Sequence, residues 1–215
     1  MNFQATPILV FGARNFAEEV ADLASEAPGL RVSGFVENYD RDRSTTLRGL
    51  PVHWIDDVAH LAATHKAVCG LGITRRLPLI TRALALGFEF TSVIHPTARV
   101  SPTSIVGTGS IISAGSVIAA RTRIGSHVVI NRGALIGHHV QIADCTNIGP
   151  GANIGGSCQI GEGVYVGIGA TLIDHLNIGP VTVVGAGAVV TRDLPSRVLA
   201  VGVPAKIIKE NIEGK

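Results

Sequence analysis

Every sixth residue from Ile94 to Val190 is aliphatic, and the pattern holds at seventeen consecutive positions without a change of phase. The residue four places after each anchor is always Ala, Ser, Thr, Cys, Val or Leu. An α-helix repeats at about 3.6 residues and a β-strand at about 2, so a sustained period of six fits neither element alone. This period is typical of a β-helix in which each hexapeptide supplies one short strand and one turn.

The hexapeptide period also predicts how the coils stack. Three hexapeptides make one triangular coil of about eighteen residues, so each residue lies beneath the one eighteen places later. The aliphatic anchors point inward, and the frequent glycines serve the turns. We expect residues 91–215 to form this β-helix domain, and we expect "VGVPAKIIK" near its end to supply a closing strand and a short C-terminal helix.

Residues 1–90 follow a different pattern, in which short apolar runs alternate with segments of helical spacing. Strands are predicted over residues 7–12, 31–37 and 66–72, and helices over 15–27, 56–63 and 74–87. Alternating strands and helices predict a parallel sheet with crossover helices. We therefore expect an α/β, Rossmann-like domain over residues 1–90.

Composition excludes several classes of function. The formal charge is only +2 and no run of Lys or Arg carries interleaved aromatics, so nucleic-acid binding is not expected. No run of eighteen apolar residues predicts a membrane span. Three unpatterned cysteines, Cys69, Cys145 and Cys158, favour a reducing, cytoplasmic setting.

Residues 94–209 resemble the hexapeptide-repeat acyltransferases, whose fold is a left-handed parallel β-helix. The stretch "GAGAVVTRDLPSRVLAVGVPAKII" is similar to the C-terminal signature of that family, and "IHPTA" at 94–98 is similar to the opening of its helix. With the α/β domain in front, the whole chain resembles NeuD-type sialic-acid O-acetyltransferases and the related nucleotide-linked amino-sugar N-acetyltransferases. The resemblance implies a homotrimer, acetyl-CoA as co-substrate in a groove between neighbouring β-helices, and a nucleotide-linked sugar on the first domain.

The same resemblance points to a catalytic histidine. In those enzymes a histidine, followed by an acid, comes a few residues after an Asn-containing segment, and here that region reads "INRGALIGHH". His138 takes the catalytic position, and His139 replaces the usual carboxylate. Acyl transfer to an amine or hydroxyl needs a base that can take a proton near neutral pH, which suits His138. A second imidazole is not expected to orient it, so we look to a backbone carbonyl, Asp144 or another subunit.

Four positions are candidates for contacts with acetyl-CoA. Asn147 stands where relatives often have a histidine that touches the cofactor. Gly156 is predicted directly above His138, where a missing side chain would let the pantetheine arm pass. Ile168 and Ala186 fall where relatives line the groove with main chain. No metal is expected.

The first domain departs most from the resemblance. Its turn after the first strand is "GARNFA", which keeps only the first glycine of the glycine-rich turn in relatives. Amides at a helix N-terminus still attract phosphate, but as a dinucleotide fingerprint the turn is weak, and NAD binding is not expected. The candidate nucleotide-binding residues are Gly12, Arg14, Asn15, Glu37, Asn38 and Gly72.

Three other functions stay open at this point. The acceptor could be a sugar hydroxyl rather than an amine. The chain could be a zinc enzyme similar to β-helix carbonic anhydrases, with His138, His139 and His175 as ligands. It could also be a scaffold that has lost activity along with its carboxylate and its glycine-rich turn.

Overall fold

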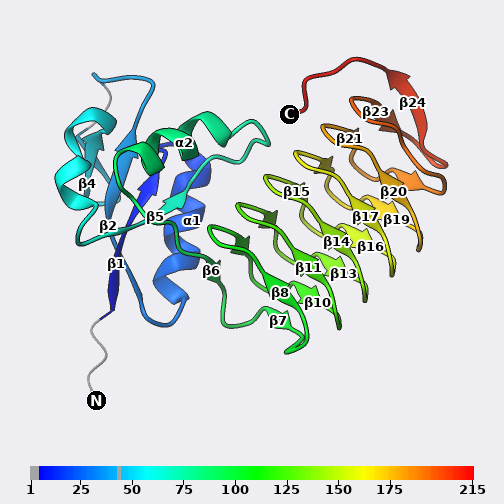
Figure 1. The fold of residues 1–215 in the computed structure, drawn as a ribbon, viewed down its shortest axis with the longest axis horizontal. Helices are drawn as coiled ribbons and strands as arrows, with labels where there is room; N and C mark the ends of the chain where they lie inside the picture. The colour runs from blue at the N-terminus through cyan, green and yellow to red at the C-terminus, as the bar shows by residue number, and fades with distance from the viewer. Residues whose placement is uncertain (1–4, 43–44) are drawn as a thin grey trace. The chain divides into compact units, whose positions relative to one another are not determined.

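The computed structural model describes residues 5–42 and 45–215, which divide into two compact units (Figure 1). One unit contains the chain up to Gly72 together with Arg76–Pro96, and the other contains Thr97–Lys215 together with Ile73–Arg75. Thr74 belongs to the second unit because its hydroxyl donates to the Lys215 carbonyl oxygen at 2.7 Å, and its N–H bonds the same oxygen. The boundary by contacts thus falls after Pro96, whereas the sequence placed it after residue 90.

The first unit is built on an open sheet in the order β3-β4-β2-β1-β5. Its strands are β1 (Thr6–Phe11), β2 (Leu30–Glu37), β3 (Thr46–Leu47), β4 (Leu50–Trp54) and β5 (Lys66–Cys69). All neighbours pair in parallel except β3 and β4, which form an antiparallel pair. The chain runs outward from β1 to β2 and β4 and then returns to β5 on the other side of β1. The carboxyl ends of the parallel strands share one edge, where open α/β sheets bind ligands.

Two α-helices accompany this sheet. Helix α1 (Asn15–Glu26) buries the stripe Ala17, Val20, Ala21, Leu23 and Ala24, at the spacing the sequence predicted. Helix α2 (Leu77–Ala85) has proline in its first turn, where no intrahelical donor is needed.

The helix predicted over 56–63 is wrong, because that segment forms two short 3₁₀ turns, Ile55–Asp57 and Ala59–Leu61. Eight residues rarely repay the cost of nucleating a helix. Strand β4 was not predicted, because its short run "LPVHW" contains a proline.

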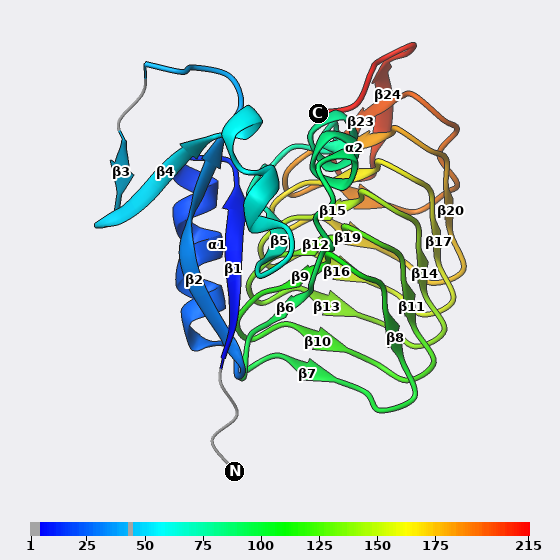
Figure 2. The same cartoon turned by 60° about the vertical axis from the view of Figure 1, so that its left-hand side comes forward.

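The second unit is a parallel β-helix whose two-residue strands recur every six residues (Figures 1 and 2). Following β6 (Val93–Ile94), the strands are β7 (Arg99–Val100), β8 (Ile105–Val106), β9 (Ile111–Ile112), β10 (Val117–Ile118), β11 (Arg123–Ile124), β12 (Val129–Ile130), β13 (Leu135–Ile136), β14 (Gln141–Ile142), β15 (Asn147–Ile148), β16 (Asn153–Ile154), β17 (Gln159–Ile160), β18 (Tyr165–Val166), β19 (Thr171–Leu172), β20 (Asn177–Ile178), β21 (Val183–Val184) and β22 (Val189–Val190). Each strand pairs with the one three strands later, as Ile136 does with Ile154. The predicted eighteen-residue coil is therefore confirmed.

The inward anchors form one continuous core with the small residues that follow them, for example Ile136 with Val140 and Ile154 with Cys158. The first anchor is an exception, since Ile94 is 38% exposed. At about half of the equivalent corners a residue other than glycine adopts the left-handed conformation, including His139 at φ 59° and His175 at φ 60°. The tight corner fixes this conformation, which explains the glycines found at the equivalent positions of other coils.

The predicted C-terminal helix is wrong. The segment forms β23 (Leu199–Val201), parallel to β21, and β24 (Lys206–Lys209), antiparallel to β23. The last coil leaves a row of backbone donors and acceptors, which an added strand satisfies and a helix would not. Ile207 and Ile208 also favour a strand.

Across the described ranges 5–42 and 45–215, no helix is long and apolar enough to cross a lipid bilayer.

Candidate active site

The two adjacent histidines lie at the corner that follows β13, and both side chains are exposed. Their Nδ1 atoms are 3.1 Å apart, within hydrogen-bond distance. The rings meet edge to face, with centroids 5.2 Å apart and an interplanar angle of 85°. His139 has the left-handed backbone conformation of the corner, with φ 59°, so the pair lies at a tight turn of the coil.

Two arrangements of protons are compatible with this contact, depending on which Nδ1 atom carries the proton. A bond between two Nδ1 atoms needs a proton on one and a lone pair on the other. When His138 donates, its Nε2 keeps a lone pair that can accept a proton, and neutral His139 carries its own proton on Nε2. A neutral imidazole nitrogen can accept this proton, so the contact gives His138 a hydrogen-bond partner that the sequence did not lead us to expect.

Asp144 does not supply this orientation within the chain. One of its carboxylate oxygens accepts the backbone N–H of Ser126 at 2.8 Å, which ties the acid to the coil below. The neighbour of His138 is thus another imidazole rather than a carboxylate.

Gly156 lies directly above His138, as the eighteen-residue coil predicted. A Cβ placed on Gly156 would lie 2.7 Å from Cε1 and 2.9 Å from Nε2 of His138. The backbone around the site is fixed as well, since the Ser157 N–H donates to the His138 carbonyl oxygen at 2.8 Å. The missing side chain makes room for the imidazole itself, a role that the sequence analysis did not foresee.

The other candidate acetyl-CoA residues lie elsewhere on the coil. Asn147 is on β15 and is only 3% exposed. Ile168 and Ala186 occupy the corner after β18 and β21 and stack one coil apart, with Ile168 58% exposed. One chain therefore does not bring these three residues to His138.

A hollow of about 890 Å³ runs along the outer face of β14, β17 and β20 and does not include His138. Its one carboxylate is Asp193, which accepts the backbone N–H and the side-chain amide of Asn177. These bonds, the backbone one first, hold the pKa of Asp193 below its ordinary value. No histidine is among the residues that line this groove.

A separate hollow of about 310 Å³ lies at the carboxyl edge of the sheet in the first unit. Its walls are Gly12, Ala13, Arg14, Glu37, Asn38, Tyr39 and Leu71. Four of the six predicted nucleotide residues thus come together, and Asn15 and Gly72 do not line the space. Gly72 instead packs against Phe16, whose ring a Cβ would meet at 3.1 Å. The sequence analysis missed Tyr39, although an aromatic residue just after a strand-end acid was a usable signal.

Hydrogen bonds and a cation–π contact position the side chains around this hollow. Glu37 is 4% exposed, and its Oε1 accepts the backbone N–H groups of Asn38 and Tyr39 at 2.9 and 2.8 Å. The Arg14 guanidinium lies 5.2 Å from the centre of the Tyr39 ring. Gly12 has φ 124°, which a side chain would rarely adopt, and α1 begins three residues later. The Ala17 N–H donates to the Arg14 carbonyl oxygen at 2.7 Å, and the N-terminal end of a helix is suited to an anion.

Among the residues placed by the structure, no group of three or more His, Cys, Asp and Glu side chains could hold a metal ion. His175 lies 3.6 Å from the carboxylate of Asp174.

Neither the protein-family models nor the curated proteins yield a match. Several solved structures do match this chain. A histidine variant of perosamine N-acetyltransferase from Caulobacter crescentus, in complex with CoA and GDP-perosamine, is 34% identical over 95% of this chain and 97% of that one, with a TM-score of 0.89. The acetyltransferase domain of PglB from Neisseria gonorrhoeae FA1090, in complex with acetyl coenzyme A, is 30% identical over 95% and 100%, with a TM-score of 0.87. WeeI from Acinetobacter baumannii AYE is 28% identical over 94% and 100%, with a TM-score of 0.86.

Proposed function

Because this chain belongs to the nucleotide-amino-sugar N-acetyltransferases of the hexapeptide-repeat β-helix family, we propose that it moves the acetyl group of acetyl-CoA to the amino group of a nucleotide-linked amino sugar. The observation that carries this proposal is the His138–His139 pair, an oriented imidazole at a β-helix corner. In the Caulobacter structures, CoA and the nucleotide sugar are bound together, and variants with a substituted histidine were studied.

His138 acts as the general base. The lone pair of the sugar amine attacks the thioester carbonyl carbon, and Nε2 of His138 takes the proton that the amine loses as the new C–N bond forms. The C–S bond then breaks, and the protonated imidazole returns its proton to the departing CoA sulfur. Backbone N–H groups of the coil are suited to stabilise the negative oxygen of the intermediate. Neither a metal nor an acyl-enzyme takes part.

His139 is a positioning residue in this scheme. By accepting the Nδ1 proton of His138, it leaves the reactive lone pair on Nε2. An imidazole performs here the orienting role that a carboxylate performs in the resembling enzymes, without adding a negative charge.

The first unit holds the nucleotide. We assign it a Rossmann-like role, with the phosphates at the Gly12–Arg14 turn and the first-turn amides of α1, beginning at Asn15, as their donors. Glu37 and Asn38 stand at the end of β2, where an acid meets the ribose in such folds. The order of the parallel strands, β4-β2-β1-β5, supports this assignment. Strands β2 and β4 are added on one side of β1 and β5 on the other, so the strand order reverses at β1, beside the hollow.

The second unit works as a left-handed β-helix in a homotrimer. Asn147, Gly156, Ile168 and Ala186 contact acetyl-CoA, and the separation of Ile168 and Ala186 from His138 within one chain supports a groove completed by a neighbouring subunit. Cys69, Cys145 and Cys158 are thiols and not disulfides, which supports a reducing cytoplasm as the site of the reaction.

The test is acetylation of a panel of nucleotide-linked amino sugars by the purified protein. Release of the CoA thiol gives the rate, and mass spectrometry of the product locates the acetyl group on nitrogen. His138→Asn should abolish transfer and leave acetyl-CoA affinity nearly intact by calorimetry. His175→Asn, an exposed histidine on the same edge of the β-helix two coils beyond His139, is the matched control and should keep wild-type turnover. Near-normal turnover in His138→Asn would remove it as the base, and an absence of acetyl-CoA binding would refute the function.

A further inference from the structure

A second hollow, of about 220 Å³, lies beside the proposed nucleotide site at the same edge of the sheet. The two hollows share Glu37, and the second continues across β2 to β4, where Trp54 and His53 line it. In the parallel pairing of β2 and β4, Glu37 is directly level with Trp54. The edge of the sheet thus offers one continuous path from the Gly12 turn, past Glu37, to Trp54.

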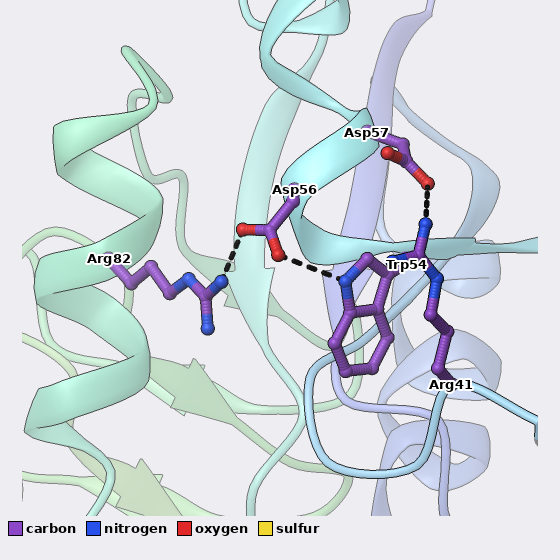
Figure 3. Close-up of polar contacts among 5 residues, drawn as sticks. All are labelled: Arg41, Trp54, Asp56, Asp57 and Arg82. Atoms are coloured by element: carbon purple, nitrogen blue, oxygen red, sulfur yellow. Dashed lines mark hydrogen bonds and ion pairs between the residues drawn. The ribbon is translucent and has the colours of Figure 1, made fainter.

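Trp54 is held in a fixed orientation (Figure 3). Its indole N–H donates to Oδ2 of Asp56 at 3.0 Å, and Oδ1 of Asp56 accepts from Arg82 on α2. The Arg82 hydrogen bond first, and then the Trp54 hydrogen bond, hold the pKa of Asp56 below its ordinary value, so Asp56 is a carboxylate at neutral pH. The bond uses the one polar atom of the indole, and the faces of the ring are left for stacking.

One face of the ring already attracts a planar polar group. The guanidinium of Arg41 lies 5.7 Å from the ring centre, and it is held there by the Asp57 carboxylate at 3.5 Å. Figure 3 shows Arg41 and Asp56 approaching the indole from different elements. Trp54 is therefore a partly exposed aromatic side chain whose orientation is held by its hydrogen bond to Asp56.

The walls of this hollow are rich in hydrogen-bond acceptors. Glu37, Asp40 and Asp57 line it with carboxyl oxygens, which are hydrogen-bond acceptors, and Arg41 and Thr45 complete its polar lining. His53 adds a neutral imidazole, because burial first, and then the nearby His60 and His65, lower its pKa. A ligand with adjacent N–H donors on a flat aromatic ring fits these walls.

We propose that this hollow binds the base of the nucleotide-linked substrate, that the base is guanine, and that Trp54 is the surface on which it stacks. This inference rests on the proposed function, which places phosphates at the Gly12 turn and the ribose at Glu37. The next group of a nucleotide along that path is the base. Guanine presents two neighbouring N–H donors on one edge, which suits carboxylate acceptors, whereas uracil presents a single N–H between two carbonyl groups. The base takes the place of the Arg41 guanidinium on the indole, and Arg41 then covers it.

Because Trp54 is the only tryptophan in the chain, its fluorescence reports directly on this site. Titration of the wild-type protein with GDP should give saturable quenching, and UDP and ADP should bind at least about tenfold more weakly. Trp54→Leu should weaken GDP binding by about 5- to 150-fold in calorimetry, the range expected for one base–aromatic stack. Its KM for the nucleotide sugar should rise with little change in kcat, and Trp54→Phe should restore most of the affinity.

The hydrogen bond from Trp54 to Asp56 can be tested separately. Asp56→Asn should reduce both the amplitude of GDP quenching and the affinity by about 3- to 10-fold, because the indole loses its fixed orientation. Glu89→Gln is the matched control, since Glu89 is also an exposed carboxylate paired with a cation, Lys66, and lies outside the hollow. It should bind GDP like the wild type.

Acetyl-CoA binding by the Trp54 variants serves as the check on folding. GDP affinity in Trp54→Leu equal to that of the wild type would overturn the stacking role while leaving the acetyltransferase function standing. Equal binding of UDP and GDP would overturn the choice of guanine. Failure of the wild type to acetylate any nucleotide-linked amino sugar would refute the proposed function, and the fluorescence titration with GDP would still decide the present inference.

Discussion

Replacing Gly156 by alanine should disable the enzyme without unfolding it. The added Cβ would lie 2.7 Å from Cε1 and 2.9 Å from Nε2 of His138, closer than side-chain atoms approach one another. Gly156 is not among the residues with a left-handed φ, so its backbone accepts alanine without strain. The atom that must move is the tip of the imidazole, which carries the proposed reaction.

The Gly156→Ala substitution should change the free energy of unfolding only slightly. Forcing the ring off its rotamer, or swinging it away from His139 and losing that hydrogen bond, costs about 0.5–1.5 kcal/mol. Replacing glycine by alanine restricts the unfolded chain and returns about 0.4–1 kcal/mol. The free energy of unfolding should therefore change by no more than about 1 kcal/mol. A base displaced by about 1 Å can cost about 100-fold in rate, so kcat should fall by about that factor.

The assay compares CoA release with denaturant unfolding in Gly156→Ala and Gly155→Ala. At Gly155 the new Cβ would meet the backbone nitrogen of Asp174 at 2.5 Å, which cannot move aside, so that variant should lose about 1–3 kcal/mol of stability. Turnover in Gly156→Ala within twofold of the wild type would refute the placement of the reactive imidazole beneath Gly156.

Three further predictions concern the pair, the core and the edge of the β-helix. His139→Ala should lower kcat by about 2- to 10-fold through loss of one orienting hydrogen bond, and His139→Asp should recover it, measured by CoA release. Ile148→Ala, at a fully buried anchor, should lower the free energy of unfolding by about 2–5 kcal/mol in denaturant titrations. Because the pKa of Asp193 is lowered in the folded state, ionised Asp193 stabilises the fold at pH values above the pKa that Asp193 has in the unfolded chain. That stabilisation is lost as the pH falls through the folded-state pKa of Asp193. The stability difference between wild type and Asp193→Asn should therefore be constant near neutral pH and vanish in acid, as a series of melting curves would show.

Much of the fold follows from local pattern. The period of six predicted the β-helix, its eighteen-residue coil and the contact between Gly156 and His138, because each hexapeptide repeats the same short-range geometry. Helix α1 followed from its apolar stripe. The errors lie where no period continues. The segment after Gly202 became a strand because the last coil offered it an edge, and the short run at Leu50–Trp54 became a strand because β2 lay beside it.

The sequence by itself determined that an α/β unit is followed along the chain by a stack of hexapeptide coils, and that His138 lies at one of the corners. Those properties are encoded in spacing, which a reader of the chain can count. Only the tertiary structure decided that His139 bonds His138 through Nδ1, that Gly156 makes room for the imidazole, and that Trp54 stands level with Glu37. Ring rotamers and the pairing of strands distant in sequence depend on contacts that no local period specifies.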